Sequence, residues 1–324
     1  MSNNNEQVDN EYEALKNSKF KQQKLPAWRP VPTITSTSLT FLFFGIVFII
    51  IGIFVIIYSN DIVEISQGYE IKCQLSNNCQ VEFNIPKDMK APVMVYYQLN
   101  NFYQNHRRYV KSKSNAQLKG ELFTADSLKS ANDCDPIYTM KDLNKTFSVA
   151  GTPLAAEAPA NPCGLIAKSL FTDRYALTDA NNKPITIDES NIAWDADRKL
   201  KYAQPVDPEG KDKDYWKKVQ WTDVMDEHFM VWMRPAGLPN FRKLWGRVNT
   251  NLTAGNYKML VNSTYDVSQF KGEKLFVLST VNSFGGKNSF LGISYIVVGT
   301  ICIVMAIAFV IGYKIHNSQN RKEN

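Results

Sequence analysis

The chain has 324 residues, a net charge of +6 and 12% aromatic residues. A charge this small on a chain this long does not indicate a nucleic-acid partner. Its three histidines leave little material for general acid–base catalysis. The distribution of the apolar and charged residues along the chain is more informative than the totals.

Two long apolar segments lie near the two ends of the chain. Residues 39–59 and 290–313 contain no charged side chain. A bilayer core takes about 20 apolar residues as a helix, so each segment is long enough to span one. Their length disfavours a soluble core helix, and the first begins too far into the chain for a cleaved signal peptide. The sequence therefore predicts two transmembrane helices.

Basic residues precede the first predicted span and follow the second, whereas Asp61 and Glu64 come directly after the first span. Positive flanks stay in the cytosol, so both termini are predicted to be cytosolic. The basic residues are Lys16, Lys19, Lys21, Lys24 and Arg29 before the first span, and Lys314, Arg321 and Lys322 after the second. The predicted organisation is a cytosolic tail (1–38), a first span (39–59), a lumenal or extracellular domain (60–289), a second span (290–313) and a cytosolic tail (314–324).

Four of the five cysteines lie in the predicted outer domain, and Cys302 lies in the second span. An even number of cysteines in an oxidising compartment indicates disulfides. Four cysteines allow three pairings. We favour Cys73–Cys79, around the turn-like residues 76–78, and Cys134–Cys163, which closes a longer loop.

Three N-x-[ST] acceptor sites lie in the outer domain, at Asn144, Asn251 and Asn262, and the two tails contain none. One such site often arises by chance, but three on the predicted outer side agree with the topology. The sequence predicts N-glycosylation at these residues.

The outer domain contains many short β-branched or aromatic runs separated by turn residues. Such runs predict a mainly antiparallel, β-sandwich-like domain with long loops. The predicted strands are 81–85, 93–99, 185–187, 228–233, 257–261 and 275–281, and one short helical piece is predicted within 163–174. Long connections, such as 150–162 and 206–218, suit a surface that meets a partner.

Small residues recur every seven positions in both spans, which places each set on one helix face. Such stripes let helices approach closely in lipid. The composition of membrane spans is an equally good explanation. If the stripes are real, the two helices pack on each other or on a third helix. The sets are Ser38, Gly45, Gly52 and Ser59, and Gly292, Gly299 and Ala306.

We find no sequence signature of catalysis. G-x-S-x-G, H-E-x-x-H and G-x-x-x-x-G-K-[ST] are all missing. No C-x-x-C is present, and His106 and His228 are isolated, which disfavours a metal site. We predict no enzyme activity, no cofactor and no metal, and a partner subunit or receptor becomes the favoured class.

Three long segments then carry a family resemblance: YYQLNNFYQNHRRYVKS (96–112), NPCGLIAKSLF (161–171) and HFMVWMRPAGLPNFRKLWG (228–246). Together with LPAWRP at 25–30, the chain resembles the cell-cycle-control-protein-fifty/ligand-effect-modulator family, over residues 25 to 313. Its members are accessory β-subunits of type IV P-type ATPases, the phospholipid flippases.

The resemblance implies two spans, a glycosylated and disulfide-bonded outer domain, and a 1:1 complex with the ATPase catalytic subunit. It implies a role in folding, in export of the ATPase from the endoplasmic reticulum and in transport. The complex is expected in the secretory pathway: endoplasmic reticulum, Golgi, endosome or plasma membrane. The basic tails either contact anionic membrane lipids or simply fix the topology.

Partner contacts are expected on the outer domain, on the pair of spans and on the proline-rich arm. Trp28 and Arg29 lie in the proline-rich arm, which is either an interfacial anchor or an arm on the cytosolic face of the ATPase. In 96–112, Tyr97, Phe102 and Tyr103 can pack inward, while the basic residues either clamp the ATPase or form an internal ion-pair network. The full set of candidates is Trp28, Arg29, Tyr103, His106, Arg107, Arg108, Phe241 and Arg242.

A two-span ligand-gated ion channel subunit has the same topology and is the alternative function. Such channels usually have more cysteines in the outer domain and assemble as homotrimers. The mass of the purified particle distinguishes the two functions.

Overall fold

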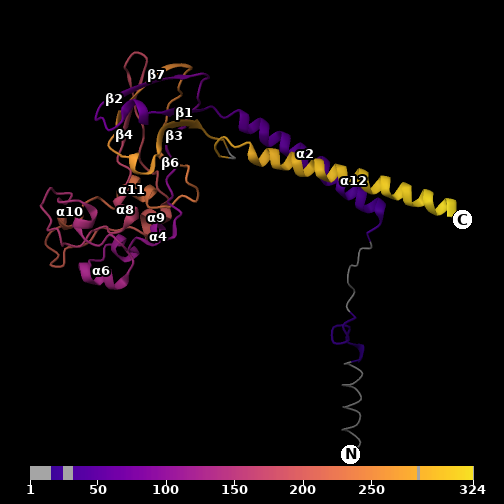
Figure 1. Cartoon of the computed structure of the whole chain (residues 1–324), viewed down its shortest axis with the longest axis horizontal. Helices are drawn as coiled ribbons and strands as arrows, with labels where there is room; N and C mark the ends of the chain where they lie inside the picture. Colours follow the sequence, from indigo (N-terminus) through magenta and orange to yellow (C-terminus); the bar gives the residue numbers. More distant parts are fainter. Residues whose placement is uncertain (1–15, 25–31, 283–284, 324) are drawn as a thin grey trace, which may run out of the picture. The chain divides into compact units, whose positions relative to one another are not determined.

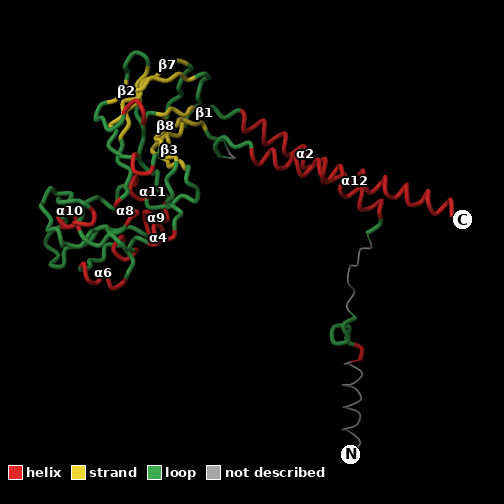
Figure 2. Tube along the Cα trace, in the orientation of Figure 1, coloured by secondary structure: helices red, strands yellow, loops and turns green. Residues whose placement is uncertain are grey.

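The computed structural model describes residues 16–24, 32–282 and 285–323. The chain divides into two compact units, residues 1–56 with 290–324 and residues 57–289. The predicted fold class, two membrane-spanning helices and a mainly antiparallel β-domain, is confirmed. Figure 1 traces the chain from the N-terminus to the C-terminus, and Figure 2 separates helices from strands.

The first unit is a pair of helices, α2 (Ile34–Asn60) and α12 (Phe290–Glu323). Both are long and apolar enough to cross a membrane. The first begins at Ile34 rather than at residue 39, and the second continues past Lys314 to Glu323. Aromatic contacts join them, with ring centroids 5.7 Å apart for Phe41 and Phe309.

The small-residue stripes face the partner helix. A Cβ atom added to Gly299 would lie 2.8 Å from the carbonyl oxygen of Gly45, and one added to Gly52 would lie 2.8 Å from that of Gly292. Ser38 and Ala306 are buried in the same contact. The two helices therefore pack on each other, and glycine is required where their backbones meet.

We expect Gly299→Val to separate the helix pair, because a side chain there has no space between the two backbones. Overpacking of this kind costs on the order of 1–3 kcal/mol. Phe48 and Tyr295 face each other, with ring centroids 5.8 Å apart. In a Cys302→Ser background, disulfide formation between cysteines placed at 48 and 295 should fall several-fold. Gly312→Val is the control, because no atom lies within 4 Å of a Cβ there. Equal cross-linking in the two variants would contradict the packing.

The second unit contains two four-stranded antiparallel sheets, with strand orders β1-β8-β3-β6 and β2-β7-β4-β5. All neighbouring strands in both sheets run antiparallel. The strands are β1 (Glu64–Gly68), β2 (Cys79–Ile85), β3 (Val93–Asn100), β4 (Arg174–Asp179), β5 (Pro184–Ile185), β6 (Phe241–Val248), β7 (Gly255–Asn262) and β8 (Glu273–Thr280).

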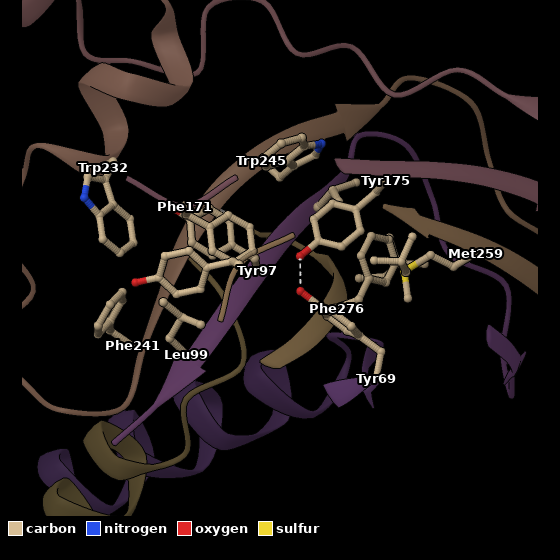
Figure 3. Close-up of a cluster of buried hydrophobic side chains, with 14 of the residues drawn as sticks. Tyr69, Tyr97, Leu99, Phe171, Tyr175, Trp232, Phe241, Trp245, Met259 and Phe276 are labelled. Atoms are coloured by element: carbon tan, nitrogen blue, oxygen red, sulfur yellow. Dashed lines mark hydrogen bonds between the residues drawn. The ribbon is translucent and has the colours of Figure 1, made fainter. Parts of the chain in front are cut away.

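The two sheets share one hydrophobic core. Side chains alternate between buried and exposed along β2, so that every second residue points inward. Contacts cross from one sheet to the other: Phe83 and Tyr175 lie against Phe276, and Tyr175 lies against Trp245. Figure 3 shows Tyr175, Trp245 and Phe276 gathered in the core, with Tyr69 hydrogen-bonded to Tyr175. The unit is therefore a β-sandwich with an aromatic core.

Two long insertions carry most of the short helices, which lie at one end of the sandwich in Figure 1. The first, between β3 and β4, holds α4 (Arg107–Lys111), α5 (Asn115–Leu118), α6 (Ala125–Ala131), α7 (Met140–Leu143) and α8 (Leu165–Lys168). The second, between β5 and β6, holds α9 (Asp195–Leu200), α10 (Tyr215–Val219) and α11 (Glu227–Trp232). Two short elements lie outside them, α3 (Glu70–Cys73) and a 3-10 turn (Ser268–Phe270).

The strand predicted at 228–233 is wrong, because this segment forms helix α11. Asp226 caps the helix by accepting a hydrogen bond from the backbone N–H of His228. Phe229, Trp232 and Met233 are buried at helical spacing. A short apolar run does not distinguish a strand from a buried helix by periodicity alone.

Other predicted elements are closer to the structure. The strands predicted at 81–85, 93–99, 257–261 and 275–281 lie within or on β2, β3, β7 and β8, and the helical piece in 163–174 is α8. The strand predicted at 185–187 is shorter in the structure, where β5 ends at Ile185. Strands β1, β4 and β6 had no counterpart in the prediction.

Candidate partner-binding surface

The three long segments of the sequence analysis meet in one aromatic cluster. Tyr97 of β3 stacks on Phe171, with ring centroids 4.0 Å apart and an interplanar angle of 2°. Trp232 of α11 also lies near Phe171, with ring centroids 6.5 Å apart. Its indole N–H donates to the carbonyl oxygen of Ile166 at 2.8 Å. The segments 96–112, 161–171 and 228–246 therefore pack against one another, and this packing accounts for several of their aromatic residues (Figure 3).

The loop after β3 is anchored to the domain by the partly buried Phe102 and the fully buried Gln104. Phe102 packs against Phe270 and Trp232, with centroids at 4.9 and 5.9 Å. Gln104 is fully buried, and its side-chain oxygen accepts a hydrogen bond from the backbone N–H of Ala236 at 2.9 Å. The Asn105 amide donates to the carbonyl oxygen of Gly237 at 2.9 Å. The loop is thereby fixed to residues 236–237.

The remaining polar side chains of this loop and of the first turn of α4 face outward. Tyr103 is 58% exposed, so the expectation that it packs inward is wrong. His106, Arg107 and Arg108 are also exposed. The Arg108 guanidinium lies 3.1 Å from the Asp135 carboxylate, in a solvent-exposed ion pair worth at most about 1 kcal/mol. The basic residues therefore do not form a buried internal network, and their donors face solvent.

Phe241 and Arg242 lie on opposite faces of β6. Phe241 is buried and lies in the ring cluster around Phe102, 6.3 Å away, so its ring supports the surface from inside. Arg242 lies on the outer face of β6, where it donates to the Gln98 side-chain oxygen at 2.7 Å and pairs with Glu64 at 2.8 Å. Trp28 and Arg29 lie outside the described residues.

A buried lysine joins α11 to β6. Lys243 is 7% exposed, and its ammonium donates to the carbonyl oxygens of Val231 and Trp232, both at 2.9 Å, and to that of Arg234. Such carbonyls at the end of a helix lack intrahelical partners, and a lysine satisfies them. Burial lowers the pKa of Lys243 to about 7. This contact fixes the turn that follows α11, and the sequence analysis did not identify it.

A second buried charge sits on α9. Asp197 is 2% exposed, and it binds the guanidinium of Arg234 and, at 2.8 Å, the ammonium of Lys201. The hydrogen bond from Arg234 holds the pKa of Asp197 below its usual value. The guanidinium also lies over the exposed Trp194 ring, 4.8 Å from its centroid. Asp197 thus fixes the orientation of Arg234 at the surface.

We find no candidate metal site in residues 16–24, 32–282 and 285–323. In these ranges, no three His, Cys, Asp or Glu side chains gather as metal ligands. His228 lies 2.9 Å from the Glu189 carboxylate and packs against Trp245, with ring centroids 4.0 Å apart, which makes it part of the packing around the core. The arrangement is that of a rigid scaffold with an exposed polar and aromatic loop.

Both disulfides favoured from the sequence are present. The Cα atoms are 5.3 Å apart for Cys73–Cys79 and 5.7 Å apart for Cys134–Cys163. The acceptor asparagines Asn144, Asn251 and Asn262 are all exposed.

Comparison with known proteins gives consistent results. The chain matches the LEM3 (ligand-effect modulator 3) family / CDC50 family over residues 2–319. It is 38% identical to ALA-interacting subunit 3 of Arabidopsis thaliana, over 92% of this chain and 86% of that protein. It is 36% identical to cell cycle control protein 50A of Bos taurus, over 94% and 90% of the two chains. It is 31% identical to human cell cycle control protein 50B, over 94% and 95%.

Proposed function

Because the chain belongs to the LEM3/CDC50 family, we propose that it is a non-catalytic accessory subunit of a P-type ATPase that moves phospholipids between membrane leaflets. The observation that carries the proposal is the family match over residues 2–319. A relative of similar length is named as an interacting subunit. The scaffold-like outer domain and the close helix pair support a protein that works by binding.

In this proposal, the chain forms a 1:1 complex with the ATPase, assists its folding and its export from the endoplasmic reticulum, and is required for transport. Both termini are cytosolic, and residues 60–289 face the lumen or exterior of the secretory pathway. The basic flanks of the spans support this sidedness.

We further propose that the loop after β3 contacts the ATPase through its outward side chains. Tyr103 and His106 are exposed on this loop, and Arg107 is exposed on the first turn of α4, directly after a backbone that the Gln104–Ala236 hydrogen bond fixes. A preorganised loop loses little entropy on binding. Arg108 and Arg242 lie in ion pairs with Asp135 and Glu64 and take a smaller part. For Trp28 and Arg29 we propose a cytosolic contact.

Affinity purification tests the assignment. Tagged full-length chain is extracted from membranes in a mild detergent, and the co-purifying proteins are identified. We expect one P-type ATPase of much larger mass, in equal amount. Purification of the chain alone, or as a homotrimer, would refute the proposal, and a homotrimer would favour the ion channel. Tyr103→Ala with Arg107→Ala should reduce the recovered ATPase, while exposed Lys90→Ala, outside that loop, should not.

The three acceptor sites provide a separate test of sidedness. We expect Thr146→Ala, Thr253→Ala and Thr264→Ala each to remove one glycan, because the acceptor asparagines are exposed. The threonines are changed because Asn144 occupies a left-handed position at the end of α7 and Asn251 accepts a hydrogen bond from Ala91. Electrophoretic mobility before and after glycosidase treatment is the measurement. A chain unaffected by glycosidase would place the domain in the cytosol.

A further inference from the structure

A basic cavity lies between the two insertions of the outer domain. Its volume is about 620 Å³, within the range of small-molecule sites. Three separate stretches of chain line it, at 113–119, 197–202 and 233–235. Backbone hydrogen bonding joins two of them, because the N–H of Ala203 donates to the carbonyl oxygen of Leu118 at 2.9 Å. The cavity is therefore built into the folded domain.

Charge in this cavity is unbalanced. Its lining includes four cationic side chains, those of Lys113, Lys119, Lys201 and Arg234, and one carboxylate, that of Asp197. This carboxylate already binds Lys201 and Arg234. Within the described ranges, no carboxylate lies in ion-pair distance of Lys113 or Lys119. The lining carries a net charge of +3.

The cations are close enough to repel one another. Lys113 is half-buried, and its pKa is lowered by burial and by the Lys201 ammonium. Like charges around a concave, partly dry site cost free energy until an anion enters. The repulsion is therefore a reason for the cavity to bind a counter-charge.

The floor of the cavity is apolar. Leu118 and Met233 are buried, at 4% and 2% exposed, and Tyr202, Pro235 and the polar Asn115 complete the lining. A site of this kind takes an anionic group together with a small organic body. A phosphate monoester carries a charge of about −1.5 to −2 at neutral pH and presents several acceptor oxygens. It balances the net charge better than a carboxylate does.

We propose that this cavity binds a dianionic phosphate group, with Lys113 and Lys119 as the principal ligands and Arg234, held by Asp197, as a third. The phosphate is either free in solution or the headgroup of an anionic lipid. The inference does not depend on the ATPase assignment, because it uses only the geometry of residues 57–289.

Calorimetric titration of the full-length chain in phosphatidylcholine nanodiscs tests the proposal. The probes are inorganic phosphate, glycerol 3-phosphate and dihexanoyl phosphatidic acid below its micelle concentration, with dihexanoyl phosphatidylcholine as the zwitterionic control. Saturable binding of inorganic phosphate supports a free phosphate. Binding of dihexanoyl phosphatidic acid alone supports a lipid headgroup. Binding of none of the three phosphates at millimolar concentration overturns the proposal.

Two variants of the cavity lysines and one control locate the site. Lys113→Gln/Lys119→Gln should raise the Kd by about tenfold or more, because each lysine makes a charge-assisted hydrogen bond to the phosphate. Lys111→Gln, an exposed lysine of α4 outside the cavity, should leave the Kd unchanged. The single change Lys119→Gln removes an exposed side chain, so the fold is retained and the Kd still rises. An unchanged Kd in Lys119→Gln and the double variant, or an equal loss in Lys111→Gln, refutes the assignment.

Discussion

Replacing Lys274 by methionine is expected to lower the free energy of unfolding of the sandwich by about 3–5 kcal/mol. The Lys274 ammonium is fully buried, 2.9 Å from the Asp173 carboxylate, which is also fully buried. It donates further to the Ser263 hydroxyl at 2.8 Å and to the Tyr265 carbonyl oxygen at 2.6 Å. Without the lysine, the carboxylate remains in the core with its principal cation removed.

The remaining contacts of Asp173 define the control. Its second oxygen accepts from the backbone N–H groups of Thr264 and Tyr265, at 2.6 and 2.7 Å, and Tyr69 donates to the first at 2.7 Å. Asparagine retains an oxygen for the two N–H groups and carries no charge. Lys274→Met/Asp173→Asn should therefore be less destabilised than Lys274→Met alone.

Urea unfolding followed by tryptophan fluorescence measures both variants, because Trp232 and Trp245 are buried in the core. The exposed Lys90→Met should stay within about 0.5 kcal/mol of the unchanged protein. If Lys274→Met also stays within that range, the pair does not stabilise the sandwich. If the double variant is the least stable, the asparagine does not replace the carboxylate as an acceptor.

Physical patterns in the sequence predict the elements whose apolar residues follow a simple rule, either an uninterrupted run or a strict alternation. The two spans follow from length and the absence of charge, and β2 and β7 follow from alternation. Strand β6 was not predicted, because Lys243 points inward among apolar neighbours and obscures the alternation of apolar and polar residues. Strand β1 is five residues long and mostly polar, with a signal too weak to separate it from a loop.

The buried charges illustrate a second limit. Lys274, Phe276 and Leu278 alternate along β8, and all three are buried. A lysine in an inward register is a sequence signal for a buried partner. The sequence does not reveal which residue that partner is, because Asp173 lies in another part of the chain and approaches Lys274 only when the two sheets pack. The basic cavity is a similar case, since its cations come from three stretches that meet only in the fold.

The sequence of the loop after β3 does not determine which of its side chains face solvent. The segment 96–112 carries a family resemblance, but its basic residues are compatible with either an internal network or a surface position. Burial of Gln104 against the 236–237 backbone orients the loop so that Tyr103 and Arg107 are exposed. This orientation depends on a hydrogen bond between residues 132 positions apart, which sequence pattern does not reveal.

The second large effect is expected from Cys134→Ala/Cys163→Ala. The disulfide lies inside a small hydrophobic cluster with Leu128, Met140 and Leu143, separate from the main core. It closes a loop of 29 residues, which corresponds to about 3.6 kcal/mol in the chain-entropy model. The cluster is too small to hold this region without the disulfide. Removing the disulfide should therefore unfold the region around α6 and α7 while the sandwich stays folded.

Hydrogen exchange read by mass spectrometry distinguishes the two regions. Amides of α6 and α7 should exchange faster in the variant, while those of β3 and β8 stay protected. Cys73→Ala/Cys79→Ala is the matched control, because that disulfide closes only 6 residues and corresponds to about 2.2 kcal/mol. If β3 and β8 lose protection together with α6 and α7, then the small cluster and the main core unfold as one cooperative unit. In that case the insertion stabilises the sandwich on which it is built.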